Sequence, residues 1–255
     1  MKLNFKKYGN AEQAVVIVHG LFGMLDNWHN IAKKLSDEYT ILTVDVRNHG
    51  NSPHSDIINY PTIADDLLEL VNDQGLSHAH FVGHSMGGKA VMELSNIHPH
   101  IIDKLVVVDI APKRYKPGHL ELFEAMFSLP MEELSSRSEA DDALKAKIPT
   151  DGIRLFLLKN LQRNPEGGYQ WKANLKAIRA NYDDIIGDIQ LNWPFVNDVL
   201  FIRGEKSNYI KDSDLDEIYE YFPNADLVTI PNAGHWVHAE NPTQFVDALE
   251  DFLNA

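Results

Sequence analysis

The stretch Ala79-His80-Phe81-Val82-Gly83-His84-Ser85-Met86-Gly87-Gly88-Lys89-Ala90-Val91 decides the fold that this sequence predicts. It reads as a short apolar strand, a turn with glycines on both sides of one serine, and an amphipathic helix. This is the G-x-S-x-G pattern of a nucleophile elbow, a sharp strand-to-helix turn that exposes a serine hydroxyl. We expect Gly83 and Gly87 to be required because a Cβ would not fit where the two backbones approach. Ser85 is therefore a candidate nucleophile.

The composition narrows the class of protein. The chain has 255 residues, enough for one large α/β domain that carries an insertion, and a formal net charge of −14. Such an acidic chain repels nucleic acid and anionic membrane surfaces, so we expect neither as a stable partner. It contains no cysteine, which excludes disulfides, thiolate zinc sites and a cysteine nucleophile. No apolar run near the N-terminus is long enough for a signal peptide or a membrane span, and we expect a cytoplasmic protein.

Buried strands alternate with helices along most of the chain. Continuous β-branched and apolar runs such as Ala14–Val18 and Thr40–Val44 are typical of strands buried on both faces of a parallel sheet. Similar runs precede Ser85, end just before Asp109, and return after residue 198. The alternation predicts an α/β fold with a mostly parallel central sheet flanked by helices on both faces.

The strand pattern is interrupted between residues 113 and 193, where helical segments occur without a strong buried strand. We expect residues 1–112 and 194–255 to form the two parts of the core, and residues 113–193 to form a helical lid inserted before the last two strands. The insertion leaves from the carboxyl end of a strand, which is where α/β sheets bind ligands. A second structural subdomain without a role at the site is the alternative.

A serine hydroxyl is a weak nucleophile and needs a base within hydrogen-bond reach. The candidate is His235, which lies in the loop after the last strand, where Gly234 leaves room for the backbone. His238 follows three residues later, and a histidine pair at that spacing can indicate a metal site. No His-Glu-x-x-His pattern surrounds it, so we expect no metal and a packed or hydrogen-bonded His238.

Two backbone N–H groups are expected to stabilise the oxyanion that forms when Ser85 attacks a carbonyl. Met86 supplies one at the start of the helix, and Leu21 supplies the other from the turn His19-Gly20-Leu21. Phe22 is the alternative to Leu21 as the second donor.

Four motifs together resemble those of the α/β-hydrolase superfamily, and more narrowly the bacterial YbfF-type esterases and the abhydrolase-domain-11 proteins. In chain order they are His19-Gly20-Leu21-Phe22-Gly23, Asp45-Val46-Arg47-Asn48-His49-Gly50-Asn51-Ser52, Gly83-His84-Ser85-Met86-Gly87-Gly88 and Gly234-His235-Trp236-Val237-His238. The resemblance spans nearly the whole chain and is weakest in the lid. It implies a serine carboxylesterase or thioesterase that acts on small acyl esters without a cofactor. The alternatives are a lyase like that of the menaquinone pathway, a C–C hydrolase, and a ligand receptor without catalytic activity.

The acid that orients His235 is expected to be Asp109. In many members of the superfamily the acid follows the strand after the lid, but this chain has Ser207 there, and a serine cannot hold negative charge. Asp109 ends an apolar strand, where a charge is costly unless it is paired. The resemblance points to the same position. Asp212 and Asp214, in the loop after the later strand, are the alternatives.

Aromatic side chains are the expected walls of the acyl pocket. Trp236 directly follows the base, and Phe22 lies in the glycine turn. The lid candidates are Phe123, Phe127, Trp171 and Tyr182. Bulky aromatics at these positions would favour short acyl chains; packing inside the lid is the alternative for the lid residues.

A basic cluster of Lys113, Arg114 and Lys116 stands where the lid leaves the sheet. It is a candidate for the phosphates of an acyl-CoA, with a solvated hinge surface as the alternative. The expected partner is therefore a small-molecule acyl ester or an acyl-CoA. We expect a monomer or a homodimer.

Overall fold

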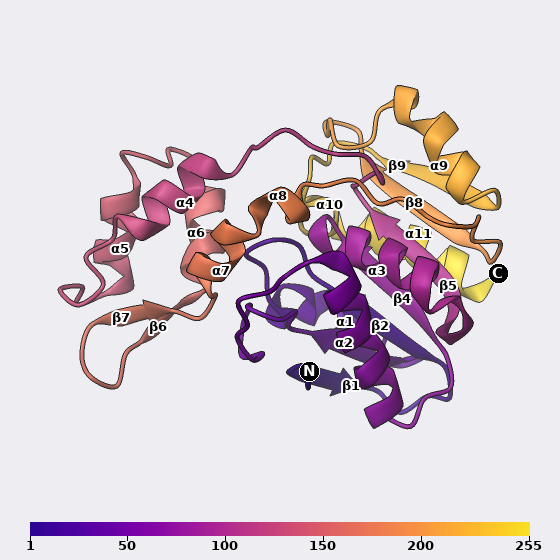
Figure 1. Cartoon of the computed structure of the whole chain (residues 1–255), viewed down its shortest axis with the longest axis horizontal. Coiled ribbons are helices and arrows are strands. Elements are labelled where there is room, and N and C mark those ends of the chain that lie inside the picture. Colours follow the sequence, from indigo (N-terminus) through magenta and orange to yellow (C-terminus); the bar gives the residue numbers. More distant parts are fainter.

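A sheet of seven strands forms the centre of the computed structural model, which describes residues 1–255 (Figure 1). The strands lie in the order β1-β3-β2-β4-β5-β8-β9, and all are parallel except β1, which pairs antiparallel with β3 at one edge. Their bounds are β1 Phe5–Tyr8, β2 Ala14–Val18, β3 Thr40–Val44, β4 Ala79–His84, β5 Ile102–Val108, β8 Val199–Gly204 and β9 Ala225–Ile230.

Helices cover both faces of this sheet, so the predicted α/β architecture is confirmed. One face packs against α2 (Tyr60–Asp73), α3 (Met86–Ile97) and α9 (Leu215–Tyr221). The other packs against α1 (His29–Leu35) and α11 (Pro242–Asn254). The shorter helical turns are η1 Leu25–Trp28, η2 Pro99–Ile101, η3 Asp212–Asp214 and α10 Val237–Glu240. None of these helices has both the length and the apolar character needed to cross a bilayer.

Strand β2 is apolar at every position because both faces of the sheet are buried there. All five residues of β2 are buried, and they alternate between two cores. Val16 and Val18 pack on the α2–α3 side, whereas Val15 and Ile17 pack on the α1–α11 side. A strand between two helix layers needs apolar side chains at every position, as the continuous run predicts.

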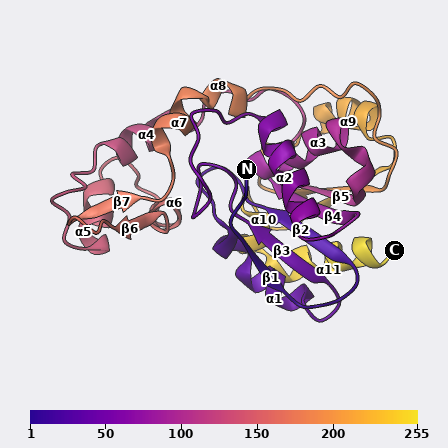
Figure 2. The same ribbon diagram turned by 60° about the horizontal axis from the view of Figure 1, so that its bottom comes forward.

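The segment between β5 and β8 forms the insertion, residues 113–193, which lies to one side of the sheet in both views (Figures 1 and 2). It contains α4 Leu120–Phe127, α5 Arg137–Leu144, α6 Asp151–Leu158, β6 Leu161–Arg163, β7 Tyr169–Trp171, α7 Leu175–Ala180 and α8 Tyr182–Ile185. The expectation of helices alone is corrected by β6 and β7, which pair antiparallel as a two-stranded hairpin. Each of these strands has three residues, too few to show an alternating pattern in the sequence.

One buried lysine joins the insertion to the core. Lys89 lies in α3 with 1% of its surface exposed, and its backbone N–H donates to the Ser85 carbonyl at 3.1 Å. Its amino group donates to the Lys113 carbonyl at 2.8 Å, where the chain enters the insertion. The same group donates to the Gly187 carbonyl, where the chain returns to the core. One side chain thus holds both connections of the insertion beside the elbow helix.

Candidate functional site

Ser85 sits at the turn between β4 and α3, with φ 53° and ψ −116°. This left-handed conformation is rare for a residue with a side chain. The two flanking glycines permit it, because a Cβ at Gly83 would lie 2.2 Å from the Gly87 carbonyl oxygen and one at Gly87 would lie 2.3 Å from the Val18 carbonyl oxygen. The glycine requirement predicted for the elbow is therefore confirmed.

Positive φ angles gather at this site. Five residues other than glycine have them, and three are the site candidates Phe22 (φ 60°), Ser85 (φ 53°) and Asp109 (φ 52°). Each such conformation costs about 1–3 kcal/mol and persists only where the surroundings enforce it. Backbone strain is thus concentrated on the turns that present the candidate residues to one another.

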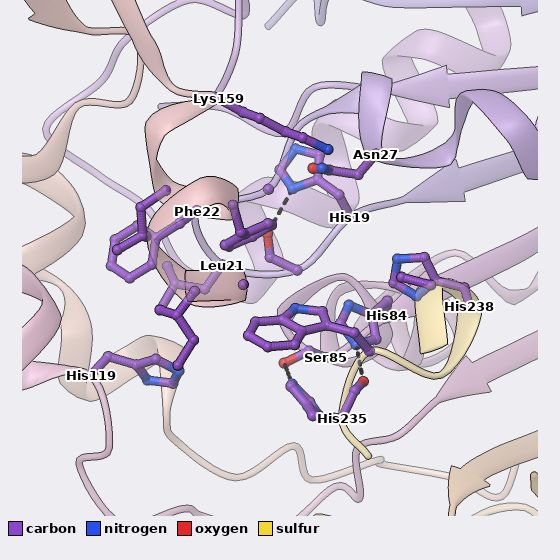
Figure 3. A pocket seen from close by; sticks show the side chains of 18 of the residues that line it. His19, Leu21, Phe22, Asn27, His84, Ser85, His119, Lys159, His235 and His238 are labelled. Carbon is purple, nitrogen blue, oxygen red and sulfur yellow. Dashed lines mark hydrogen bonds between the residues drawn. The ribbon is translucent and has the colours of Figure 1, made fainter. Parts of the chain in front are cut away.

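Three predicted residues from three different loops meet through hydrogen bonds. Figure 3 shows the contact between Ser85 and His235. His235, between β9 and α10, has its Nε2 atom 3.0 Å from Ser85 Oγ. Its Nδ1 atom lies 2.8 Å from Oδ2 of Asp109, which directly follows β5 and is fully buried. With Nδ1 protonated and donating to the carboxylate, Nε2 is free to accept the serine proton.

The Asp109 carboxylate is satisfied by several donors, as a buried charge requires. The Gly204 N–H donates to Oδ1 at 3.1 Å, and the Ser207 hydroxyl donates to the same Oδ2 that accepts from His235. The two alternative acids lie elsewhere. Asp212 pairs with Arg203 at 2.7 Å, and Asp214 pairs with Lys113.

The glycine turn after β2 lies beside the elbow. His19 fixes this turn: its Nδ1–H donates to the Gly20 carbonyl at 2.8 Å, and its Nε2 accepts from the Val46 N–H at 3.1 Å. Burial lowers the pKa of His19 to about 4, so the ring stays neutral and keeps both roles at neutral pH. The N–H groups of Leu21 and Phe22 donate to no acceptor in the chain, which leaves both available to a ligand.

Met86 is the first residue of α3, so its N–H has no carbonyl partner within the helix. It also lies at the positive end of the helix dipole. Free backbone N–H groups thus occur in both turns near Ser85, at Met86 in the elbow and at Leu21 and Phe22 in the glycine turn.

Aromatic rings surround the His235 imidazole. The Tyr209 ring stacks on it at a centroid distance of 3.7 Å and an interplanar angle of 15°. The His84 ring is a second neighbour, with ring centroids 4.8 Å apart, and its Nε2 lies 2.8 Å from the His235 carbonyl oxygen. Burial, and secondarily the neighbouring His235 and His238, keep the pKa of His84 well below its usual value. A neutral His84 can therefore donate to this carbonyl and hold the loop that carries His235.

His238 is packed, as the sequence predicted. Its ring stacks on Trp28 with centroids 4.1 Å apart, and burial lowers its pKa to about 3. No group of three or more histidine, cysteine, aspartate and glutamate side chains is arranged to hold a metal ion.

A cavity of about 670 Å³ opens above Ser85. Core loops and the insertion both line it, and α6 supplies a continuous part of the wall. The apolar side chains that line it include Leu21, Phe22, Leu122, Ile153, Leu155, Phe156, Leu157 and Trp236. The wall around Ser85 is therefore built jointly by the core and the insertion.

Two of the six predicted pocket aromatics, Phe22 and Trp236, line the cavity. The four lid aromatics do not, which corrects that expectation; they are Phe123, Phe127, Trp171 and Tyr182. Phe123 is buried beneath Phe22 with ring centroids 5.0 Å apart, and the Tyr182 hydroxyl accepts from the Gly118 and His119 N–H groups. Trp171 donates to the Met126 carbonyl, and Phe127 is 48% exposed. These aromatic residues therefore make contacts away from the cavity, within the insertion and, for Phe123, with the glycine turn of the core.

Sequence reasoning missed most of the insertion's contribution to the wall. Ile153, Phe156 and Leu157 come from α6, and Leu122 from α4. The apolar stretch at 155–161 indicated a buried helix face, but not that part of it faces the serine. The stacking of Tyr209 on His235 could not be predicted from the sequence, because it depends on the course of the loop after β8.

The basic cluster at the start of the insertion does not line the cavity. Lys113 is paired with Asp214, and Arg114 Nη2 lies 3.7 Å from Asp183 Oδ1. These cations are already partly neutralised by acids of this chain, so they offer no phosphate site at the cavity. The hinge-surface interpretation fits their contacts.

The fold and the elbow define the class: this is an α/β enzyme of the hydrolase type. The chain belongs to the alpha/beta hydrolase fold family, which it matches over residues 13–242. It is 37% identical over 260 residues to Esterase YbfF of Escherichia coli, with 100% of each chain covered. The "sn-1-specific diacylglycerol lipase ABHD11" of Mus musculus is 40% identical over 248 residues, 94% of this chain and 80% of the lipase.

A solved structure gives the same result. The structure described as "Marine microorganism esterase" superposes with a TM-score of 0.96 at 40% identity, and the match covers 98% of this chain and 99% of that one. The resemblance stated from the four motifs is confirmed, and the chain is a hydrolase of the ester-acting class.

Proposed function

We propose that this protein is a serine esterase in which Ser85 forms an acyl-enzyme, His235 is the base and Asp109 is the acid. The observation that carries the proposal is the hydrogen-bonded series from Ser85 Oγ to His235 Nε2 (3.0 Å) and from His235 Nδ1 to Asp109 Oδ2 (2.8 Å). The substrate is a small-molecule ester, in keeping with the names of the relatives and the size of the cavity.

Acylation begins when His235 Nε2 takes the Ser85 proton as Oγ attacks the ester carbonyl. The imidazolium that forms is stabilised by the buried Asp109 carboxylate, which accepts from Nδ1–H without becoming protonated. His235 then gives its proton to the leaving alcohol, and the acyl group stays on Ser85. Water repeats the sequence: His235 takes its proton, the acid is released and the Ser85 hydroxyl is restored.

The negative charge on the carbonyl oxygen is stabilised by the Met86 N–H and by the N–H of Leu21. Both come from backbone that tight turns and the helix hold in place, so little reorganisation is needed during the reaction. Loss of one such donor typically costs about 10²–10³ in rate.

Residues 113–193 act as a lid in this proposal. Two contacts support it: α6 supplies part of the cavity wall, and the buried Asn160 amide donates to the Phe22 carbonyl at 2.6 Å. The insertion is thereby attached to the turn that carries the second oxyanion donor. Closing a site in this way excludes bulk water and positions the substrate.

The test is a Ser85→Ala variant assayed on p-nitrophenyl acetate and labelled with a fluorophosphonate. The wild type should hydrolyse the ester and be labelled, whereas the variant should stay folded, escape labelling and lose roughly 10⁴–10⁶ in kcat. Ser95→Ala is the matched control, because Ser95 lies in α3 but its hydroxyl donates to the Met92 carbonyl. Label on another serine, or a folded wild type without turnover, would contradict the proposal and favour a lyase or a receptor.

A further inference from the structure

Lys159 stands out among the residues that line the cavity. It and Glu240 are the two lining residues with an ammonium or a carboxylate side chain. The Glu240 carboxylate accepts from the Gly234 N–H at 2.7 Å and from the Trp236 N–H at 3.3 Å. The Lys159 side chain, in contrast, is exposed to solvent, and no acid of the chain forms an ion pair with it.

The chain holds the Lys159 backbone in a defined place. Its neighbour Asn160 is fully buried, donates from its amide to the Phe22 carbonyl, and accepts from the Lys172 N–H at 2.8 Å through its own carbonyl. Lys159 is thereby held above the glycine turn. Figure 3 shows its side chain extending toward Asn27 and His19, with Ser85 and His235 lower in the view and Leu21 between the two groups.

Asn27 adds a second donor at this end of the cavity. Its Oδ1 accepts from the Met24 N–H at 2.7 Å, which fixes the orientation of the amide. The Nδ2 group then donates to no acceptor in the chain, although Asn27 lines the cavity. An ammonium and an amide N–H group at one end are complementary to an anion, and hydrogen bonds from charged groups are the stronger kind.

We propose that Lys159 and Asn27 bind a carboxylate at the end of the substrate remote from the ester, so that the preferred substrates are anionic esters with an apolar spacer. This inference rests on the proposed esterase function. The apolar side chain of Leu21, which lies between the two ends, and that of Phe22, which also lines the cavity, match the spacer. The carboxylate can belong to the acyl group or to the alcohol.

The test compares kcat/KM for two pairs of esters of matched length. Methyl hydrogen adipate against methyl hexanoate places the carboxylate in the acyl group. 6-Acetoxyhexanoate against hexyl acetate places it in the alcohol. The wild type should prefer the anionic member of at least one pair by about tenfold, which is the effect of one hydrogen bond to a charged group. The pair that shows the preference identifies the side of the ester that carries the charge.

Three variants assign that preference. Lys159→Gln should remove it, chiefly through KM, while Lys159→Arg should keep it. Asn27→Asp keeps an oxygen for the Met24 N–H and supplies Lys159 with a counter-charge, so it should also remove the preference. Lys147→Gln is the control, because Lys147 is an exposed lysine of the insertion outside the cavity.

Equal losses on the anionic and neutral members in Lys159→Gln would overturn the inference and make Lys159 a structural residue. A wild type that hydrolyses neutral esters with no anionic preference would overturn it too, and would leave the esterase function standing. If the folded wild type hydrolyses none of the four esters and resists the fluorophosphonate, the proposed function itself fails.

Discussion

The Ser207 hydroxyl donates a hydrogen bond to the Oδ2 atom of Asp109, the same oxygen that accepts from His235. Ser207 occupies the position after β8 where many members of the superfamily carry the acid. In this chain the carboxylate that contacts His235 follows β5, and the residue at the later position donates to it. The two strands are neighbours in the sheet, which brings the two positions together.

Asp109→Asn should lower kcat by about 10⁴ with little change in KM, because the amide favours the wrong tautomer of the base. Steady-state kinetics on p-nitrophenyl acetate measure this. Asp212→Asn is the control, since the Asp212 side chain is 83% exposed and paired with Arg203. A large loss of kcat in Asp212→Asn together with a normal kcat in Asp109→Asn would place the acid on the later loop.

Ser207→Ala removes one donor from the buried carboxylate and should lower kcat by about tenfold. The double variant Asp109→Asn, Ser207→Asp moves the carboxylate to the later position. It should recover about a hundredfold of the activity lost in Asp109→Asn, because the carboxylate again orients the base. A double variant no faster than Asp109→Asn would show that position 207 cannot reach His235.

The stack between Tyr209 and His235 gives a prediction about a positioning residue. A ring face over an imidazolium contributes about 0.5–2 kcal/mol, so Tyr209→Leu should lower kcat by about tenfold. Tyr209→Phe keeps the ring and should retain most of the rate. If both variants lose the same activity, the hydroxyl matters and the stack does not.

Trp236 lines the cavity and packs against Phe156 of the insertion with ring centroids 5.6 Å apart. Trp236→Ala should raise kcat/KM for octanoate relative to acetate p-nitrophenyl esters by about tenfold, because the wall becomes wider. Trp193→Ala is the control, since that side chain is 81% exposed and lies outside the cavity. An unchanged ratio in Trp236→Ala would mean that chain length is set elsewhere.

Buried neutral histidines predict how stability depends on pH. Burial lowers the pKa values of His19 to about 4 and of His49 and His238 to about 3. These rings gain protons in the unfolded chain near pH ~6.5 but stay neutral in the fold. The unfolded state therefore binds more protons, and the free energy of unfolding should fall between about pH 6.5 and pH 4, by up to about 1.4 kcal/mol per pH unit for each ring.

Urea unfolding at several pH values between about pH 7 and pH 5 measures this slope. His238→Phe should flatten it, because phenylalanine can keep the stack on Trp28 without titrating. His100→Gln, at an exposed histidine, should leave it unchanged. Equal slopes in the wild type and His238→Phe would show that His238 does not contribute.

The parts of the site predicted from the sequence are those set by local backbone demands. The elbow depends on Gly83 and Gly87, because a Cβ at either position would lie only 2.2–2.3 Å from a backbone carbonyl oxygen. Asp109 and His235 follow the carboxyl ends of parallel strands, and such ends meet at one edge of a sheet. Residue type and order along the chain were therefore enough to predict that Ser85, Asp109 and His235 lie close together.

The insertion was less predictable because tertiary packing determines which neighbours its side chains contact. Phe123 and Leu122 are adjacent in α4, yet Phe123 is buried beneath Phe22 and Leu122 faces the cavity. Helical spacing shows that a face is apolar but not which partner it meets. Lys159 gave no signal for the same reason: its place depends on Asn160 and the Phe22 carbonyl, which are distant in the sequence.

The Lys89 amino group contacts both connections of the insertion, at the Lys113 and Gly187 carbonyls. The two chain segments that connect the insertion to the core therefore share one hydrogen-bond donor, Lys89. Lys89 lies one helical turn after Ser85 in α3. Both connections of the insertion are therefore fastened to the helix that begins at the elbow. The position of the cavity wall that the insertion supplies and the position of α3 thus depend on the same side chain.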